Sequence, residues 1–159
     1  MGVMVTNGAG AAFAEVAPRQ RRLVLELWDY WEAKRGARRY PSLDDIDPKD
    51  IAGIWPHCFI LDVTSFQNFP YFHYLGPRVA RYSGVFLTGR HDWSRTLLKK
   101  MVCHYKEALE RREPVLLEDE LTQYNNRRLL FRSVMLPLSD DQIAINYLLG
   151  AANGTIRKD

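Results

Sequence analysis

Apolar residues recur along the chain with two different periods, and the change of period predicts where helices and strands lie. A spacing of three to four residues, typical of a helix with one buried face, runs over residues 19–36 and again over 94–112. Short β-branched runs and stretches of alternating apolar and polar residues predict strands. We expect five strands, at residues 57–63, 71–76, 114–121, 126–138 and 143–152. Short helical turns punctuated by glycine separate the second strand from the long helix.

This order of elements predicts an α+β domain with an antiparallel sheet and helices on one face. The length of 159 residues suits one domain with a single core. We expect a flexible leader rich in glycine and alanine, an N-terminal helix, one domain and a short tail, at residues 1–18, 19–36, 37–152 and 153–159 respectively.

Four aspartates gather in the stretch PSLDDIDPKDIAGIWPH, and their spacing indicates helix caps. Asp45 follows Ser42 by three residues, as in a capping box. Asp47 precedes a proline, which is favoured at the first helical position, and Asp50 then falls in the first turn, where the helix dipole favours a negative charge. A calcium loop requires a glycine and a glutamate at fixed positions, and the stretch has neither there. We therefore interpret the aspartates as capping residues and expect no metal site.

Charge and cysteine content narrow the functional class. The net charge of +3 is spread along the chain, and no nucleic-acid recognition motif is present, so the sequence argues against nucleic-acid binding. No apolar run reaches the roughly 18 to 20 residues that a membrane-spanning helix needs. The two cysteines, Cys58 and Cys103, form no CxxC pair and no disulfide framework. A reducing cytoplasm is the expected location.

Catalytic signatures are absent from the sequence. It contains no GxSxG, no HExxH and no phosphate-binding GxxxxGK[ST] motif. His57 directly precedes Cys58 within a predicted strand, where adjacent side chains point to opposite faces. The two residues are therefore poorly placed to form a nucleophile and its base, and we interpret them as a boundary histidine and a core cysteine. We do not expect an enzyme.

Five segments of the chain together resemble a known family. They read LWDYWEAKRG, PSLDDIDPKDI, WPHCFILDV, FHYLGPRVARYSGVFLTGR and FRSVMLPLSDDQIAINYLLG, and with their surroundings they span about residues 23–150. Segments of this kind in this order are similar to the single-domain PAS-like proteins of proteobacteria, of the PAS-5 type. The chain departs from the family at WPH, where an aliphatic residue is expected before the proline, and at FRSVML, where a tyrosine-centred segment is commoner.

The resemblance implies a fold and a broad role. The fold is a five-stranded antiparallel sheet in the order 2-1-5-4-3, with helix 94–112 lying across it and an N-terminal flanking helix. The role is that of a sensory or regulatory module and not a catalyst. Such a concave sheet, covered by short helices, can enclose a small ligand cavity.

Six residues are candidates for lining that cavity. They are Met101, His104, Tyr105, Phe131, Met135 and Tyr147. Methionine provides a tolerant wall and tyrosine a polar anchor, but the same side chains could instead simply fill the core, and the sequence leaves both readings open.

The kind of ligand is narrowed by two further observations. Haem-binding PAS sensors use a histidine on the long helix, but a lone histidine such as His104 at the edge of an apolar face is usually solvated or hydrogen-bonded, so we favour an unidentified small ligand over haem. The NCRFLQ-like segment of light-sensing PAS domains has no counterpart here, so a flavin–cysteine adduct is not supported.

The N-terminal helix is the candidate interaction surface. Four residues gather on one of its faces, as in the flanking helices through which PAS domains pair: Leu23, Leu27, Trp28 and Trp31. The sequence shows no kinase, cyclase or DNA-binding region, so we expect regulation through a homodimer or a signalling partner, gated by a small ligand. Two alternatives stay open. The helix packs on its own sheet, or the protein is a haem- or metabolite-binding sensor whose bound ligand is the primary signal.

Overall fold

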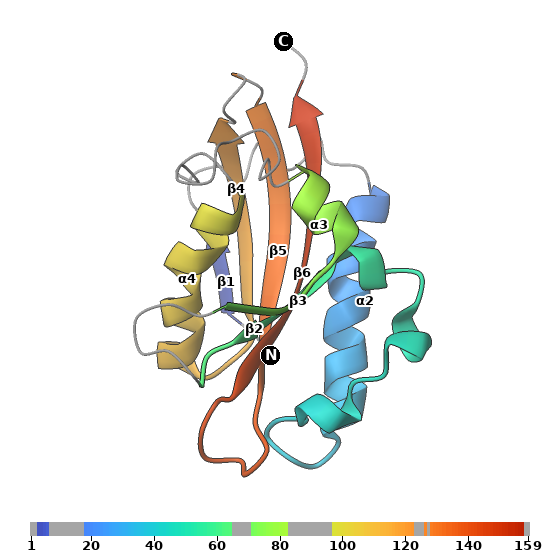
Figure 1. Cartoon of the computed structure of the whole chain (residues 1–159), viewed down its shortest axis with the longest axis vertical. Coiled ribbons are helices and arrows are strands. Elements are labelled where there is room, and N and C mark those ends of the chain that lie inside the picture. The colour runs from blue at the N-terminus through green and yellow to red at the C-terminus, as the bar shows by residue number, and fades with distance from the viewer. Residues whose placement is uncertain are drawn as a thin grey trace.

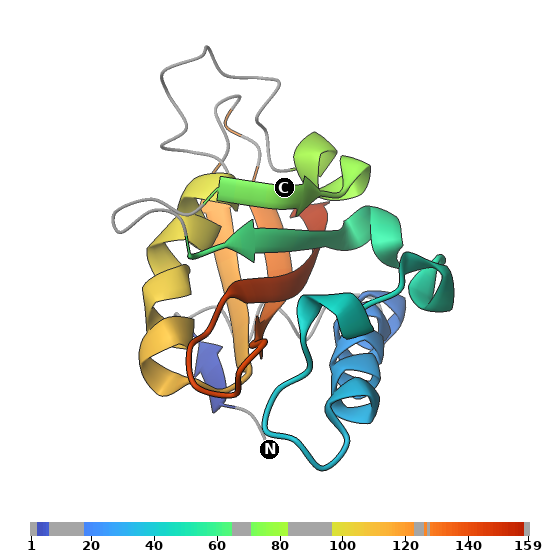
Figure 2. The same ribbon diagram turned by 60° about the horizontal axis from the view of Figure 1, so that its bottom comes forward.

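The computed structural model describes residues 3–6, 18–64, 71–82, 97–122, 126 and 128–157. Within these residues six strands form one sheet, and helices cover both of its faces (Figures 1 and 2). The strands are β1 Val3–Thr6, β2 Cys58–Asp62, β3 Tyr71–Leu75, β4 Val115–Thr122, β5 Arg128–Leu138 and β6 Tyr147–Arg157. The helices are α2 Pro18–Arg35, α3 Pro77–Tyr82 and α4 Leu97–Arg111, with 3-10 helices η1 Leu43–Asp45, η2 Pro48–Ile51 and η3 Trp55–His57.

The sheet has the predicted strand order. The strands lie side by side as β1-β4-β5-β6-β2-β3. Counted from β2 to β6 as strands 1 to 5, this is the order 2-1-5-4-3, and every pair among these five is antiparallel. The α+β fold class is therefore confirmed. Helix α4 lies on one face of the sheet and helix α2 on the other, which Figure 2 shows along the sheet.

Strand β1 corrects the expectation of a flexible leader for residues 3–6. It pairs in parallel with the edge strand β4, with Val3 opposite Val115 and Thr6 opposite Glu118. The β-branched residues of this segment favour an extended chain, and the edge of β4 would otherwise leave a row of unpaired backbone groups. Four residues are too few for an alternating pattern to reveal such a strand. The expected leader residues 7–17 lie outside the described part of the chain.

Strand β6 lies further along the chain than predicted. Residues 143–146 belong to the turn before it, and the strand continues to Arg157 through much of the expected tail. The reason is its partner, because β5 and β6 pair along their whole length, from Arg128 opposite Arg157 to Leu138 opposite Tyr147. The Asn-Gly pair at 153–154 is a typical turn signal, but here it lies inside a continuous ladder.

Helix α2 ends just before Gly36 and packs on its own sheet. Gly36 adopts φ +57°, the left-handed conformation that follows many helices and that glycine adopts at least cost. Leu27 and Trp31 are buried, and the Trp31 indole N–H donates to the Pro137 carbonyl at 2.8 Å. This packing corresponds to the first alternative that the sequence left open for the helix.

The aspartate-rich stretch forms the three 3-10 helices, and its caps are confirmed. The Asp47 carboxylate accepts a backbone N–H two residues further on at 3.0 Å. The Asp45 carboxylate accepts the Ser42 backbone N–H at 2.8 Å and binds the Arg38 guanidinium at 2.8 Å. The Ser42 N–H is the main cause that holds the pKa of Asp45 below its ordinary value. These carboxylates therefore fix the path of the chain between α2 and β2.

Each face of the sheet carries its own apolar core, in place of the single core that we expected. The α4-side core consists of Phe59, Leu61, Val79, Tyr105, Ala108, Val115, Leu117, Leu129, Phe131, Met135, Leu148 and Ala152. The α2-side core consists of Val24, Leu27, Trp31, Tyr40, Ile51, Ile54, Cys58, Ile60, Leu116, Val134, Leu136, Leu138, Leu149 and Ala151. Neighbouring strand residues enter opposite cores because side chains alternate across a sheet. No helix within the described residues is long and apolar enough to cross a membrane.

Candidate functional site

Three of the six predicted pocket residues meet in the α4-side core. Tyr105, Phe131 and Met135 are buried there among other apolar side chains. The packing is close, because the ring of Phe59 lies over Gly150 so tightly that a Cβ atom on this glycine would be 2.1 Å from the ring. The ring of Phe59 therefore occupies the space above Gly150. A ligand contact of these three residues stays a prediction.

The other three candidates are placed differently. Tyr147 precedes Leu148, which enters the α4-side core, so Tyr147 faces the α2 side, where its ring meets that of His73 edge-on at 5.4 Å. The sheet thus separates Tyr147 from the cavity in which we had placed it, and the alternation along β6 could have revealed this. His104 is half-buried, with Nδ1 3.9 Å from the Glu107 carboxylate. Met101 lies in α4, but its side chain is outside the described set.

The predicted interface residues divide into two pairs. Leu27 and Trp31 belong to the α2-side core, so a partner could reach them only if α2 left the sheet. Leu23 and Trp28 are half-buried and pack at the margin of that core. An interface role stays a prediction, and Leu23 and Trp28 are the members of the set that remain partly accessible. Leu25 is a large apolar residue of α2 that is 46% exposed, and the sequence did not single it out.

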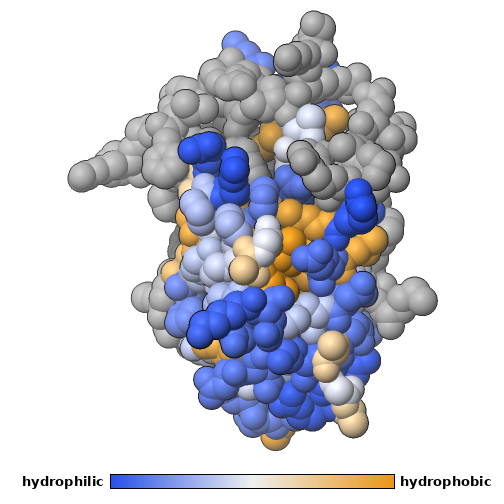
Figure 3. Space-filling model, turned by 90° about the vertical axis from the view of Figure 1, so that its right-hand side faces the viewer, coloured by the Kyte–Doolittle hydropathy of each residue, from blue (hydrophilic) through white to orange (hydrophobic). Residues whose placement is uncertain are grey.

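A surface hollow of about 640 Å³ opens between α2, η3 and α3, and we call it the α2–α3 hollow. Its lining residues are Arg22, Leu23, Glu26, Gly53, Ile54, His57, Arg78 and Asn153. The apolar members are Leu23 and Ile54, while most of the others are charged or polar. Figure 3 faces the α2 side and shows an apolar area surrounded by hydrophilic surface.

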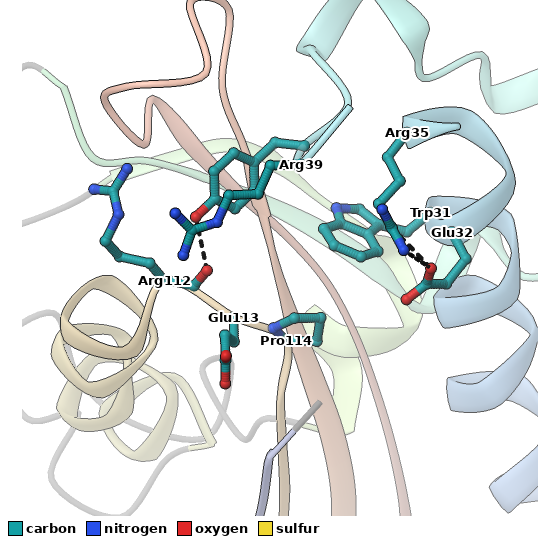
Figure 4. Close-up of a pocket in the computed structure, with 8 residues that line it drawn as sticks. Trp31, Glu32, Arg35, Arg39, Arg112, Glu113 and Pro114 are labelled. Atoms are coloured by element: carbon teal, nitrogen blue, oxygen red, sulfur yellow. Dashed lines mark hydrogen bonds and ion pairs between the residues drawn. The ribbon is translucent and has the colours of Figure 1, made fainter. Parts of the chain in front are cut away.

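A smaller hollow of about 190 Å³ lies where the end of α2 approaches the start of β4, and we call it the arginine pocket. It is lined by Trp31, Glu32, Arg35, Arg39, Tyr40, Arg112, Glu113 and Pro114. Figure 4 shows Arg39 and Arg112 on one side and the ion pair of Arg35 and Glu32 on the other. Sequence reasoning missed this pocket, because Tyr40 and Arg112 are 72 positions apart and no local pattern links them.

Cys58 occupies the position of a core cysteine, as the sequence indicated. It is buried at the start of β2, and its Sγ donates to the Ile54 carbonyl at 3.3 Å. Burial, with a smaller contribution from the charge of Glu26, raises the pKa of the Cys58 thiol to about 12. The thiol is therefore protonated at neutral pH and is a poor nucleophile. Within the described residues no three histidine, cysteine or acidic side chains are grouped so that they could hold a metal.

The family of the chain follows from a comparison of its sequence. The model of the PAS_5 family, described as a PAS domain, matches residues 19–153, which is most of the chain. The chain belongs to the PAS-domain family. The match to this PAS domain confirms the resemblance that its five segments indicated. It also confirms the general part of the functional prediction, namely that the protein is a sensory PAS module. The match begins at residue 19, so it includes helix α2 as well as the sheet.

Two solved structures are distantly similar to this PAS domain. A LOV protein of Rhodobacter sphaeroides is 14% identical, with a TM-score of 0.43, over 69% of this chain and 68% of that chain. A variant of the fungal photoreceptor VVD is 14% identical, with a TM-score of 0.41, over 80% of this chain and 93% of that chain. We infer nothing about function from likenesses of this strength. No curated protein matches the chain in sequence.

Proposed function

We propose that this PAS domain is a non-catalytic regulator that acts by binding a partner protein, with a small ligand as a gate. The observation that carries the proposal is the α2–α3 hollow. Its volume of about 640 Å³ lies in the range of roughly 300–1,000 Å³ typical of small-molecule pockets, which suits the gating ligand, and it opens at the surface beside a helix, where a partner can reach it.

The charges around the hollow indicate the chemistry of the partner. Arg22 and Arg78 are exposed on its rim, and Glu26 is the acidic residue among those lining it. A partner segment that carries an apolar side chain flanked by acidic residues would complement both the apolar floor and the basic rim. A symmetric homodimer fits this face less well, because an isologous contact would bring each basic rim toward its own copy. The buried free thiol of Cys58 supports a reducing location such as the cytoplasm.

Site-specific crosslinking from the hollow tests the proposal. A photo-crosslinking amino acid at position 23 should capture a partner in cells, and the captured protein is then purified for binding measurements. Leu23→Glu should weaken its binding by about tenfold or more, since burying a leucine side chain is worth roughly 1.5–3 kcal/mol. Leu25→Glu is the matched control, because Leu25 is exposed on the same helix and is not among the residues that line the hollow. It should leave binding unchanged.

Three results would contradict this function. The crosslinker captures only copies of this chain, it captures nothing, or the purified partner binds wild type and Leu23→Glu equally well. Circular dichroism of Leu23→Glu must first show an intact fold, since Leu23 also packs at the margin of the α2-side core. Arg78→Ala provides a second readout that does not touch the apolar floor, and it should slow association and reduce the dependence of association on salt.

A second candidate function is a metabolite sensor in which the bound ligand is the primary signal. The arginine pocket favours it, because this pocket presents cations and is far too small for haem. Native mass spectrometry with an absorbance scan on the purified protein separates the candidates. A co-purifying adduct of metabolite size supports the sensor, a Soret band would indicate haem, and an unmodified mass supports the partner-binding regulator.

A further inference from the structure

Three guanidinium groups stack on two aromatic rings around the arginine pocket. Arg39 lies 5.2 Å and Arg112 5.9 Å from the centre of the Tyr40 ring, and Arg35 lies 5.7 Å from the Trp31 ring. An arginine held over a ring by cation–π attraction keeps its N–H donors free in its own plane. The stacking therefore orients the cations without consuming the donors that would bind a ligand.

The platform below these arginines is rigid. Tyr40 is 1% exposed, and its hydroxyl donates to the Arg112 backbone carbonyl at 2.8 Å. Its own backbone is held at both groups by Gln142, because the Tyr40 N–H donates to Oε1 at 3.0 Å and Nε2 donates to the Tyr40 carbonyl at 2.9 Å. Three hydrogen bonds, one from the side chain and two at the backbone, thus fix Tyr40 across the fold. A platform of this kind is organised before any ligand arrives.

The three arginines differ in how many of their guanidinium N–H donors already bind other groups of the protein. Arg35 is paired with Glu32, with Nη2 2.8 Å from the carboxylate. Arg39 has no hydrogen bond or ion pair with any described residue, and its guanidinium lies over the Tyr40 ring. Arg112 donates one Nη2 hydrogen bond to the Ile143 carbonyl and keeps its other donors. Arg39 and Arg112 therefore offer the unused positive charge of the pocket.

The two acidic residues of the lining do not cancel this charge. Glu32 is neutralised by Arg35. Glu113 is exposed, and Figure 4 shows its carboxylate pointing away from Arg39 and Arg112. The acidic side chains of the lining thus leave the charge of Arg39 and Arg112 in place.

Arg112 also occupies a backbone position that favours another residue. It follows the end of α4 with φ +56°, and its N–H closes the helix on the Ala108 carbonyl at 2.9 Å. Glycine is the usual residue at such a position, and a side chain there costs about 1 kcal/mol or more. Glycine at position 112 would suit the backbone and would remove the guanidinium, so a single substitution can separate the two roles.

We propose that the arginine pocket binds a phosphate group, carried by a phosphate monoester of a small metabolite or present as free phosphate. Two guanidiniums that lie 5.2 and 5.9 Å from the same ring supply positive charge and N–H donors of the kind that phosphate oxygens accept. The volume of about 190 Å³ falls below the range of roughly 300–1,000 Å³ for drug-sized ligands, so it suits a single anionic group and not a large cofactor. This site is separate from the α2–α3 hollow, and the proposal stands without the partner contact.

Isothermal titration calorimetry of the full chain with inorganic phosphate and with adenosine 5′-monophosphate tests the site. Wild type should bind at least one of them, more weakly at high salt because the donors are near the surface. Arg39→Ala and Arg112→Gly should each weaken binding by about tenfold or more, the usual effect of losing hydrogen bonds to a charged group. Arg78→Ala removes the same charge outside this pocket and should bind like wild type.

The outcomes decide between the sources and can overturn the proposal. Tighter binding of the nucleotide points to a phosphorylated metabolite, and equal or tighter binding of inorganic phosphate points to the free anion. Absence of binding to both probes overturns the proposal, as does equal weakening by Arg78→Ala, which would reveal a non-specific charge effect. Retained binding in Arg112→Gly and Arg39→Ala also overturns it. Thermal unfolding of Arg112→Gly, expected at or above the wild-type temperature, shows that its loss of binding is not loss of the fold.

Discussion

The two faces of the sheet are held together in different ways. On the α4 side the rings of Phe59 and Phe72 meet edge-on at 6.1 Å, and Phe59 covers Gly150 without space between them. On the α2 side the core is crossed by bonds from side chains to the backbone, as at Trp31 and Tyr40. Close ring packing is thus evident on the first face, and hydrogen bonds from side chains to the backbone on the second. Both surface hollows that we describe adjoin the second face.

The largest change in stability is expected from substitutions of Trp31 on the α2 side. Trp31→Ala should lower the free energy of unfolding by about 3–5 kcal/mol, because it leaves a cavity in a buried position. Trp31→Phe keeps most of the apolar volume but loses the hydrogen bond to the Pro137 carbonyl, and should still cost about 1 kcal/mol or more. Urea unfolding measures both variants. If Trp31→Phe is as stable as wild type, the hydrogen bond from Trp31 to Pro137 does not stabilise the α2 side, and the proposed difference between the two faces is not supported.

A smaller effect is expected from glycine on the α4 side. Gly150→Ala should destabilise the fold by about 1–3 kcal/mol, because the new Cβ would overlap the Phe59 ring at 2.1 Å. Gly154→Ala should cost less, since its nearest neighbour at 2.8 Å is the end of the flexible Leu129 side chain. Gly53→Ala, with no atom within 4 Å, is the control. If the α4 side is closely packed, the urea midpoint should be lowest for Gly150→Ala, higher for Gly154→Ala and highest for Gly53→Ala. Equal midpoints of the three variants would contradict close packing.

Most of the fold could be predicted from local patterns, and the exceptions have physical causes. The period of apolar residues located β2 to β5, α2 and α4 to within a few residues, because each buries a regular face. The predicted end of β6, at residue 152, was wrong because pairing with β5 continues the strand to Arg157. Strand β1 was missed because its stability comes from the edge of β4, which a four-residue pattern cannot reveal.

The site was less predictable than the fold. An apolar face on α2 was evident, but the sequence could not tell whether the chain's own sheet or a partner covers it. Tyr147 was placed with Phe131, although the alternation along β6 sets it on the other face. The arginine pocket joins Tyr40 and Arg112 to the Gln142 turn, which lies 102 positions from Tyr40. Contacts of this range depend on the folded sheet and leave no motif in the sequence.

The smallest effect is expected at Cys58, whose accessibility measures how often helix α2 separates from the sheet. In a Cys103→Ser background, Cys58 is the remaining thiol, and burial raises its pKa to about 12. A thiol reagent at neutral pH should therefore label Cys58 in the folded protein only as fast as the protein unfolds. During the time in which the denatured protein is fully labelled, the folded protein should show no labelling. Rapid labelling of the folded protein would show that α2 leaves the sheet readily, which would also make Leu27 and Trp31 accessible to a partner.

The pH dependence of stability gives the same residue a second, independent readout. A thiol whose pKa is raised by folding stabilises the folded state below its ordinary value of 9.0, and this contribution is lost as the pH rises toward 12. The free energy of unfolding should thus fall over this interval in the Cys103→Ser background, and fall less in a Cys58→Ala variant of that background. Equal slopes would mean that Cys58 ionises as easily in the folded chain as in the unfolded one. In that case the α2-side core would admit water around Cys58. The two faces of the sheet would then differ in how often they open as well as in how their side chains are held.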